Sequence, residues 1–194
     1  MNYCHLGDLT QYMKDFYNIS WSKKLKQLFK LICGLRNIHD VDIIHKDFHS
    51  GNVLIMNHFS ACIGDLGISK SATETSDNNE IYGIIPYMAP EIFKGGQYTT
   101  SSDIYSFGMI MWELMVGRRP FWDQPHDTDL IIKICDGVRP PIITDAPIGY
   151  IELLKKCWDP DPNKRPKSTD VQDKRNSLIG DSNYLSKEYE MDID

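Results

Sequence analysis

The fold is decided by one stretch of the chain, Ile44-His45-Lys46-Asp47-Phe48-His49-Ser50-Gly51-Asn52-Val53-Leu54. It places a carboxylate, an amide and two imidazoles between two short apolar runs. A loop carried by a rigid scaffold is where proteins often present their chemistry. Asp, Asn, Ser and Gly are also ordinary turn formers, so this segment alone predicts a plain turn as readily as a functional loop.

The composition is that of a folded domain. The chain has 194 residues, of which 41% are hydrophobic, enough to bury a real core. Its 21 Lys and Arg stand against 27 Asp and Glu, and the net charge of -6 argues against a general nucleic-acid binder. No apolar run approaches the ~20 residues of a membrane span, and the first residues do not form a secretory leader.

The cysteines point to a cytoplasmic protein with reduced thiols. They are odd in number and widely spread, and no two have the Cys-x-x-Cys spacing. The same spacing disfavours zinc binding. The five are Cys4, Cys33, Cys62, Cys135 and Cys157.

Hydrophobic periodicity predicts a mainly α structure with a few short β-strands. A helix capped by Ser20 or Ser22 should bury one face through residue 38, and residues 104–116, apolar on nearly all sides, should form the central buried helix. Thr100, Ser101 and Ser102 are its candidate caps, and Gly117 should end it. Further helices are expected at 128–135, 148–158 and 168–179. Strands are expected at 43–44, 53–55 and 61–63, and a mobile segment at 69–80.

Five motifs in order give the chain a resemblance. The sequence is similar to the larger, C-terminal lobe of a eukaryotic protein kinase, most like the tyrosine-kinase-like branch. Each motif alone is weak, but together they cover residues 1 to about 180. They are His45-Lys46-Asp47 with Asn52, Asp65-Leu66-Gly67, Ala89-Pro90-Glu91, Asp103 at the start of the central apolar helix, and Arg165-Pro166.

The resemblance implies ATP and Mg²⁺ as cofactors, a protein substrate, and a role in signal transduction. Transfer of a phosphoryl group needs a carboxylate to orient the attacking hydroxyl and metal ions to neutralise the phosphates. Asp47 would be the catalytic carboxylate, and Asn52 and Asp65 would supply oxygens to the metal. Leu54 would lie beneath the adenine ring, and Asp8 would hold the ribose.

Structural roles are also implied by the resemblance. Glu91 and Arg165 should form a buried ion pair, although two solvated charges that never meet are the alternative. Asp103 should accept backbone hydrogen bonds from the loop, and His45 should brace that loop from within.

Several positions depart from the family pattern. Lys46 stands where many relatives have Arg, which puts control by a phosphorylated activation loop in doubt. His49 stands where serine/threonine kinases usually have a Lys, and Ile84 replaces a hydroxyl residue, so the choice between Ser/Thr and Tyr hydroxyls stays open. The candidate phosphosites are Thr73, Thr75, Ser76 and Tyr82.

The sequence holds no Gly-rich loop, strand Lys or helix Glu before the loop motifs, so we expect a partial catalytic domain without its N-terminal lobe. Residues 1–13 would be a hinge remnant and the start of a helix, 14–179 the C-lobe, and 180–194 an acidic, disordered tail. Such a chain should hold ATP poorly, should not be active on its own, and would work with an upstream regulatory domain or partner.

Two other functions remain open. The chain could be a catalytically incompetent kinase lobe, a pseudokinase-like scaffold for protein binding, although intact Asp47, Asn52 and Asp65 argue against decay. It could also be a metal hydrolase that uses His45, Asp47 and His49, since alternate residues of an extended segment can face one ion. The hydrolase would leave the later motifs unexplained.

Overall fold

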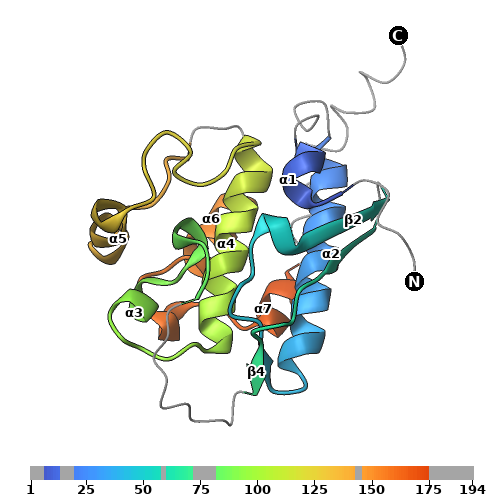
Figure 1. Ribbon diagram of the computed structural model, residues 1–194. Helices are drawn as coiled ribbons and strands as arrows, with labels where there is room; N and C mark the ends of the chain where they lie inside the picture. Colours follow the sequence, from blue (N-terminus) through green and yellow to red (C-terminus); the bar gives the residue numbers. More distant parts are fainter. Residues whose placement is uncertain (1–6, 14–19, 58–59, 72–81, 143–145, 175–194) are drawn as a thin grey trace.

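The computed structural model describes residues 7–13, 20–57, 60–71, 82–142 and 146–174. Helices dominate, and two of them run side by side through the molecule: α2 (Trp21–His39) and α4 (Thr100–Val116) (Figure 1). Smaller helices surround this pair. They are α1 (Leu9–Tyr12), α3 (Pro90–Phe93), α5 (Thr128–Cys135), α6 (Ile148–Cys157) and α7 (Ser168–Asp173).

The central helix α4 is buried along almost its whole length. Thr99 caps it by accepting a hydrogen bond from the Ser102 backbone N–H, and the Ser102 hydroxyl is in turn reached by the Thr99 backbone N–H. The expected caps at 100–102 were therefore wrong by one residue. Gly117 ends the helix in the left-handed conformation (φ 74°) that glycine adopts without a steric penalty, as predicted.

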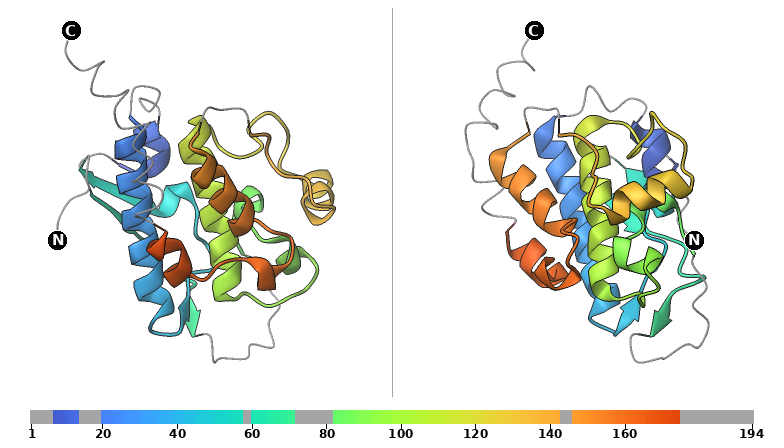
Figure 2. Two further views of the ribbon diagram at one scale, coloured as in Figure 1. Left: turned by 180° about the vertical axis from the view of Figure 1, so that it is seen from behind. Right: turned by 90° about the vertical axis from the view of Figure 1, so that its left-hand side faces the viewer.

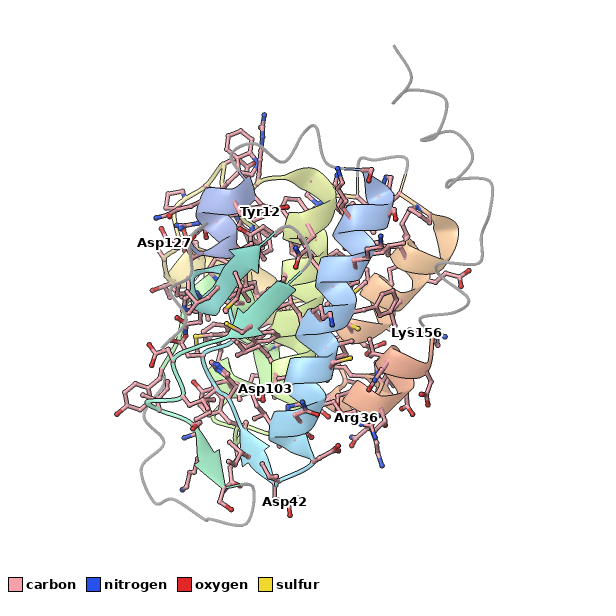
Figure 3. The ribbon with its side chains drawn as sticks, turned by 90° about the vertical axis from the view of Figure 1, so that its right-hand side faces the viewer. Tyr12, Arg36, Asp42, Asp103, Asp127 and Lys156 are labelled. Atoms are coloured by element: carbon pink, nitrogen blue, oxygen red, sulfur yellow. The ribbon has the colours of Figure 1, made fainter. Side chains whose placement is uncertain are left out.

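Helices α2 and α6 pack on α4. Ser20 caps α2, which settles the choice between the two serines. Gly108 of α4 lets α6 approach closely, because a Cβ at that position would lie 3.0 Å from the Cys157 Cβ. The left view of Figure 2, seen from behind, shows α6 and α7 in front of the α2 and α4 pair, and α5 set apart at the edge of the molecule. In Figure 3, Arg36 of α2 lies beside α7, where its guanidinium donates to the Gln172 side chain over 2.9 Å.

The strands form two small antiparallel sheets. In one, β2 (Val53–Asn57) pairs with β3 (Ser60–Ile63), with Leu54 opposite Cys62. In the other, β1 (Ile43–Ile44) pairs with β4 (Lys70–Ser71). The strand β4 was not predicted, since it falls at the start of the segment expected to be mobile. Ile43 lies opposite Ser71 and Ile44 opposite Lys70, so β4 supplies the backbone partner of β1 next to the loop.

Three-residue 3₁₀ turns complete the described structure: η2 (Ser50–Asn52), η3 (Ile85–Tyr87) and η4 (Pro162–Lys164). The predictions for most of residues 69–80, for residues 175–179 of the last helix and for the tail from 180 lie outside the described residues. No helix in the described ranges has both the length and the apolar character needed to cross a membrane.

Candidate active site

The loop from His45 to Asn52 is held by a buried carboxylate on α4. Asp103 accepts hydrogen bonds from the backbone N–H groups of His45 (2.8 Å) and Lys46 (3.0 Å). The His39 imidazole, at the end of α2, reaches the same carboxylate over 2.9 Å. Figure 3 shows Asp103 inside the molecule beside α2. Lys46 has φ 70°, an uncommon value for a side-chain-bearing residue, and the bond to Asp103 holds it there.

His45 braces the loop from the inside, as expected. It is fully buried, and its Nε2 lies 3.0 Å from the Gly64 carbonyl oxygen. A carbonyl only accepts, so Nε2 carries a proton and is not a free metal ligand. Among the residues that the structure describes, no three His, Cys, Asp or Glu side chains are grouped to hold a metal ion.

Asp47 is the partly exposed carboxylate of the loop. The Asn52 side-chain amide donates to the Asp47 backbone carbonyl over 2.9 Å and lies 3.4 Å from its carboxylate. The His49 Nε2 lies 3.5 Å from the same carboxylate. Hydrogen bonding from His49 is the largest influence on the pKa of Asp47 and lowers it, against the opposing effect of burial. Asp47 is therefore held ionised, ready to accept a hydrogen bond from a hydroxyl.

The orientation of His49 follows from its own partner. Its Nδ1 accepts a hydrogen bond from the Gly51 backbone N–H over 3.0 Å. In the neutral imidazole the proton is then on Nε2, the nitrogen that faces Asp47. The His49 ring also lies 5.9 Å from the Tyr87 ring, centre to centre.

Asn52 and Asp65 lie on neighbouring segments. The Gly64 backbone N–H donates to the Asn52 carbonyl over 2.8 Å, which brings the residue before Asp65 against the loop. Asp65 is exposed, has φ 54°, and accepts from the Gly67 N–H over 3.2 Å. Because the Asn52 amide nitrogen is used by Asp47, its side-chain oxygen is left as an acceptor. Two hard oxygen donors from adjacent segments fit Mg²⁺.

The other two predicted binding residues are neighbours. Asp8 and Leu54 form an antiparallel bridge at the edge of β2, next to the Ile55 N–H that donates to the Gly7 carbonyl over 2.9 Å. The Leu54 side chain lies over Gly64, 3.2 Å from where a Cβ would stand. The Asp8 carboxylate caps α1 by accepting from the Gln11 N–H over 2.8 Å. The chain thus brings Asp8 and Leu54 to the edge of the segment that carries Asp65.

The predicted ion pair is present and bidentate. The two terminal nitrogens of Arg165 lie 2.6 and 2.7 Å from the two carboxylate oxygens of Glu91. The Arg165 side chain is fully buried, and it also donates to the carbonyls of Asp159 and Ser101. This geometry ties α3 to the segment before α7, and it excludes the alternative of two solvated charges.

Lys46 contacts an aromatic ring in this structure. Its ammonium lies 5.5 Å from the centre of the Tyr98 ring, close enough for a cation–π attraction. The Tyr98 hydroxyl donates to the Tyr82 carbonyl over 2.5 Å and accepts from the Tyr82 N–H over 3.0 Å. Of the candidate phosphosites only Tyr82 is described, and its side chain is exposed. Thr73, Thr75 and Ser76 lie outside the described residues.

A buried chain of hydroxyl groups beside the loop was missed from the sequence. The Tyr87 hydroxyl donates to the Glu113 carboxylate over 2.5 Å, Ser50 lies 3.0 Å from that hydroxyl, and Thr10 lies 3.1 Å from Ser50. Glu113 is fully buried, and burial raises its pKa to about 7. The one available signal was Glu113, an acidic residue in the apolar part of α4. A buried carboxyl group needs hydrogen-bond partners, so its position indicated that polar groups lie beside it.

Comparison with known proteins gives the family. The model of the family described as protein tyrosine and serine/threonine kinase matches residues 1–174. A serine/threonine-protein kinase/receptor of Acanthamoeba polyphaga mimivirus is 34% identical over 167 residues, which are 85% of this chain and 10% of that protein. A LIM domain-containing serine/threonine-protein kinase of Dictyostelium discoideum is 33% identical over 140 residues, 72% of this chain and 21% of that protein.

This chain belongs to the protein kinase family. The predicted fold class is confirmed, since the mainly helical structure with a few short strands around a central buried helix is that of a kinase large lobe. The chain spans only about a tenth to a fifth of the length of these curated relatives, 10% and 21% in the two cases.

Proposed function

We propose that this chain is the C-terminal lobe of a protein kinase domain that transfers the γ-phosphoryl group of ATP to a hydroxyl on a protein substrate. The observation that carries the proposal is the arrangement around Asp47. An ionised, partly exposed carboxylate is fixed by Asn52 and His49, and Asn52 is linked through Gly64 to the segment of Asp65. A hydroxyl-orienting group next to two hard oxygen donors is what phosphoryl transfer requires.

Each residue has a separate part in the proposed reaction. Asp47 accepts a hydrogen bond from the attacking hydroxyl and orients it. Asn52 and Asp65 would hold Mg²⁺ through their side-chain oxygens, and the ion would neutralise charge on the phosphates of ATP. Leu54 offers an apolar surface to the adenine ring, and Asp8 offers an oxygen to the ribose. Asp103 takes no part in the chemistry and keeps the loop in place.

Serine and threonine hydroxyls are the proposed targets. The relatives named above are called serine/threonine-protein kinases, while the family description covers tyrosine as well. That double description also supports a place in the tyrosine-kinase-like branch. His49 and Ile84, which stand at the two departures from the usual serine/threonine pattern, make the hydroxyl preference worth measuring directly.

The domain limits and the setting are also proposals. We place the lobe at residues 14–179, after a hinge segment at 1–13 and before an acidic tail at 180–194. Cys33, Cys135 and Cys157 are free thiols, which supports work in the reducing cytoplasm. A signalling role and a regulatory partner are proposed on the family alone.

The test is magnesium-dependent nucleotide binding by the purified chain. We expect millimolar ATP with Mg²⁺ to raise the Tm, ATP with EDTA to give a smaller shift, and Asp65→Asn to abolish the magnesium-dependent part. With an N-terminal kinase lobe supplied, radiolabel transfer from ATP to peptides with a single Ser, Thr or Tyr then measures the hydroxyl preference, with Asp47→Asn as the inactive control.

The experiment tests nucleotide binding and phosphoryl transfer separately. A chain whose Tm does not respond to ATP with Mg²⁺ does not bind nucleotide as proposed, which would leave the protein-binding scaffold as the better function. Binding without transfer to any hydroxyl, even with an N-terminal lobe supplied, would contradict the proposed phosphoryl transfer.

A further inference from the structure

A small cavity opens beside the Asp47 loop. Its volume is about 90 Å³, enough for a carboxylate or phosphate group, and three segments far apart in the sequence line it. The lining residues are His49, Ser50 and Gly51 from the loop, Ile84, Pro86 and Tyr87 from the segment around η3, and Arg119 and His126 from the turns after α4.

One cationic side chain and two imidazoles line this cavity. Arg119 is exposed, and its guanidinium forms no hydrogen bond or ion pair with any residue that the structure describes. The His126 Nε2 donates to the Phe121 carbonyl over 3.1 Å, so its ring position is fixed. His49 and His126 complete the set, and no Asp or Glu lines the cavity. The chain as a whole has a net charge of -6, whereas the side chains that line this cavity carry positive charge from Arg119 and no negative charge.

The nearest buried acid, Glu113, interacts electrostatically with Arg119 and offsets only part of this charge. Glu113 faces a neighbouring cavity, and its carboxylate receives the Tyr87 hydroxyl on Oε2. Burial raises the pKa of Glu113 to about 7, so near neutral pH much of it is uncharged. The Arg119 side chain is exposed and can still meet an anion from outside.

The cavity is placed where a substrate peptide would pass. His49 lines it on one side and touches the Asp47 carboxylate on the other, over 3.5 Å. A chain that presents a hydroxyl to Asp47 has its neighbouring side chains within reach of the cavity. The hydroxyl of Ser50 and the ring of Tyr87 add a polar and a flat apolar wall.

We propose that this cavity is a specificity subsite that accepts an acidic side chain, carboxylate or phosphorylated, flanking the target hydroxyl of a substrate peptide, with Arg119 as its anchor. The inference rests on the proposed function, because it needs the peptide to reach Asp47. It predicts a protein kinase that prefers acidic sequences around its target.

Peptide binding tests the subsite without requiring catalysis. A fluorescent peptide series carries Ala in place of the target hydroxyl and one Glu moved stepwise through the flanking positions, with a matched series in which Gln replaces Glu. We expect one position at which Glu lowers the Kd about tenfold relative to Gln. Arg119→Gln should abolish the difference, and Arg119→Glu should make Lys the favoured residue at that position.

Arg118→Gln is the matched control. Arg118 is the adjacent arginine, stacks over the Trp122 ring at 4.3 Å and does not line the cavity, so its variant should keep the full Glu preference. A phosphoserine at the favoured position should bind at least as tightly as Glu. Millimolar inorganic phosphate should not reproduce the effect, because the peptide supplies the remaining contacts.

Each outcome bears on a different claim. Equal Kd values for the Glu and Gln series at every position would overturn the subsite. Loss of the preference in Arg118→Gln to the same extent as in Arg119→Gln would overturn the assignment of the anchor, and full displacement by inorganic phosphate would make this a free-anion site. Arg119-dependent Glu preference in a chain that transfers no phosphoryl group would support the subsite and contradict the catalytic proposal.

Discussion

The residue that most distinguishes this loop is His49. Its Nδ1 is occupied by the Gly51 N–H, so the neutral ring can offer a proton only from Nε2, toward Asp47. A lysine at this position would carry a permanent charge on a flexible stem. An imidazole held by the backbone gives a shorter, fixed donor, and it acts directly on the carboxylate that orients the hydroxyl.

Replacement of His49 should raise the pKa of Asp47. In His49→Leu the hydrogen bond that most lowers this pKa is gone, while burial still raises it. The carboxyl titration of Asp47, followed by carbon NMR with Asp47→Asn for assignment, should move to higher pH. His126→Leu removes another imidazole that does not contact Asp47 and should leave the titration unchanged. An Asp47 titration that is the same in His49→Leu and the natural chain would contradict this assignment.

The Glu91–Arg165 pair should be a major stabilising contact. Glu91→Ala leaves the fully buried Arg165 guanidinium without its carboxylate, and we expect a loss of about 3–5 kcal/mol in the free energy of unfolding, measured in urea. Lys164→Ala breaks the exposed Lys164–Asp161 contact at 3.9 Å and should cost ~0–1 kcal/mol. If Glu91→Ala lowered the free energy of unfolding as little as Lys164→Ala, the Glu91–Arg165 ion pair would not be a major stabilising contact.

At the scale of elements, α4 joins the loop to the rest of the fold. Its first turn supplies Asp103 to the loop, and its last turns supply Glu113 to Tyr87. Between them Gly108 allows contact with α6. One helix therefore fixes the loop, the segment around η3 and the helical layer behind, so a shift of α4 would reach all three.

The close approach at Gly108 gives a test of this packing. Gly108→Ala places a Cβ 3.0 Å from the Cys157 Cβ and 3.3 Å from the Trp158 nitrogen. Alanine favours a helix by up to about 1 kcal/mol over glycine, but overpacking costs about 1–3 kcal/mol, so the Tm should fall. Gly34→Ala in α2 meets only the flexible end of Ile63, at 3.3 Å, and should not lower the Tm. Equal Tm changes in Gly108→Ala and Gly34→Ala would show that α6 can move away from α4 without a cost in stability.

The loop motifs and the central helix were predictable from the sequence. The strand β4 and the exact cap of α4 were not, because no sequence pattern distinguishes them from their neighbours. Asp47, Asn52 and Asp103 stand in motifs whose order is informative, and the apolar run of α4 is unmistakable. The strand β4 is two polar residues with no periodicity, so nothing in Lys70–Ser71 indicates it. The Thr99 cap stands among four consecutive hydroxyl residues that are equally suitable, and only the backbone geometry selects one.

At the scale of the whole molecule, Glu113 should link stability to pH. Its pKa is raised from an ordinary 4.5 to about 7 in the folded chain, chiefly by burial. Folding therefore favours the neutral carboxyl, and this contribution is full below pH 4.5 and is lost as the pH rises through 7. Each pKa unit corresponds to about 1.36 kcal/mol, so the loss relative to low pH is roughly 3 kcal/mol.

Urea unfolding from pH 5 to pH 8 measures this effect. Glu113→Gln keeps an acceptor for Tyr87 without the charge, so its stability relative to the natural chain should rise across this range by the same few kcal/mol. Glu152→Gln changes an exposed carboxyl and should give a difference that does not vary with pH. If the stability difference between Glu113→Gln and the natural chain did not change from pH 5 to pH 8, Glu113 would be ionised over this whole range.

The hydroxyl chain from Thr10 to Glu113 also has a direction. Tyr87 has one hydroxyl proton and gives it to Glu113, so its oxygen accepts from Ser50, and Ser50, having spent its own proton, accepts from Thr10. All three protons thus point toward α4, and their order is set by a single acceptor. The Thr10 hydroxyl of α1 is consequently polarised by a carboxylate to which it is linked only through Ser50 and Tyr87.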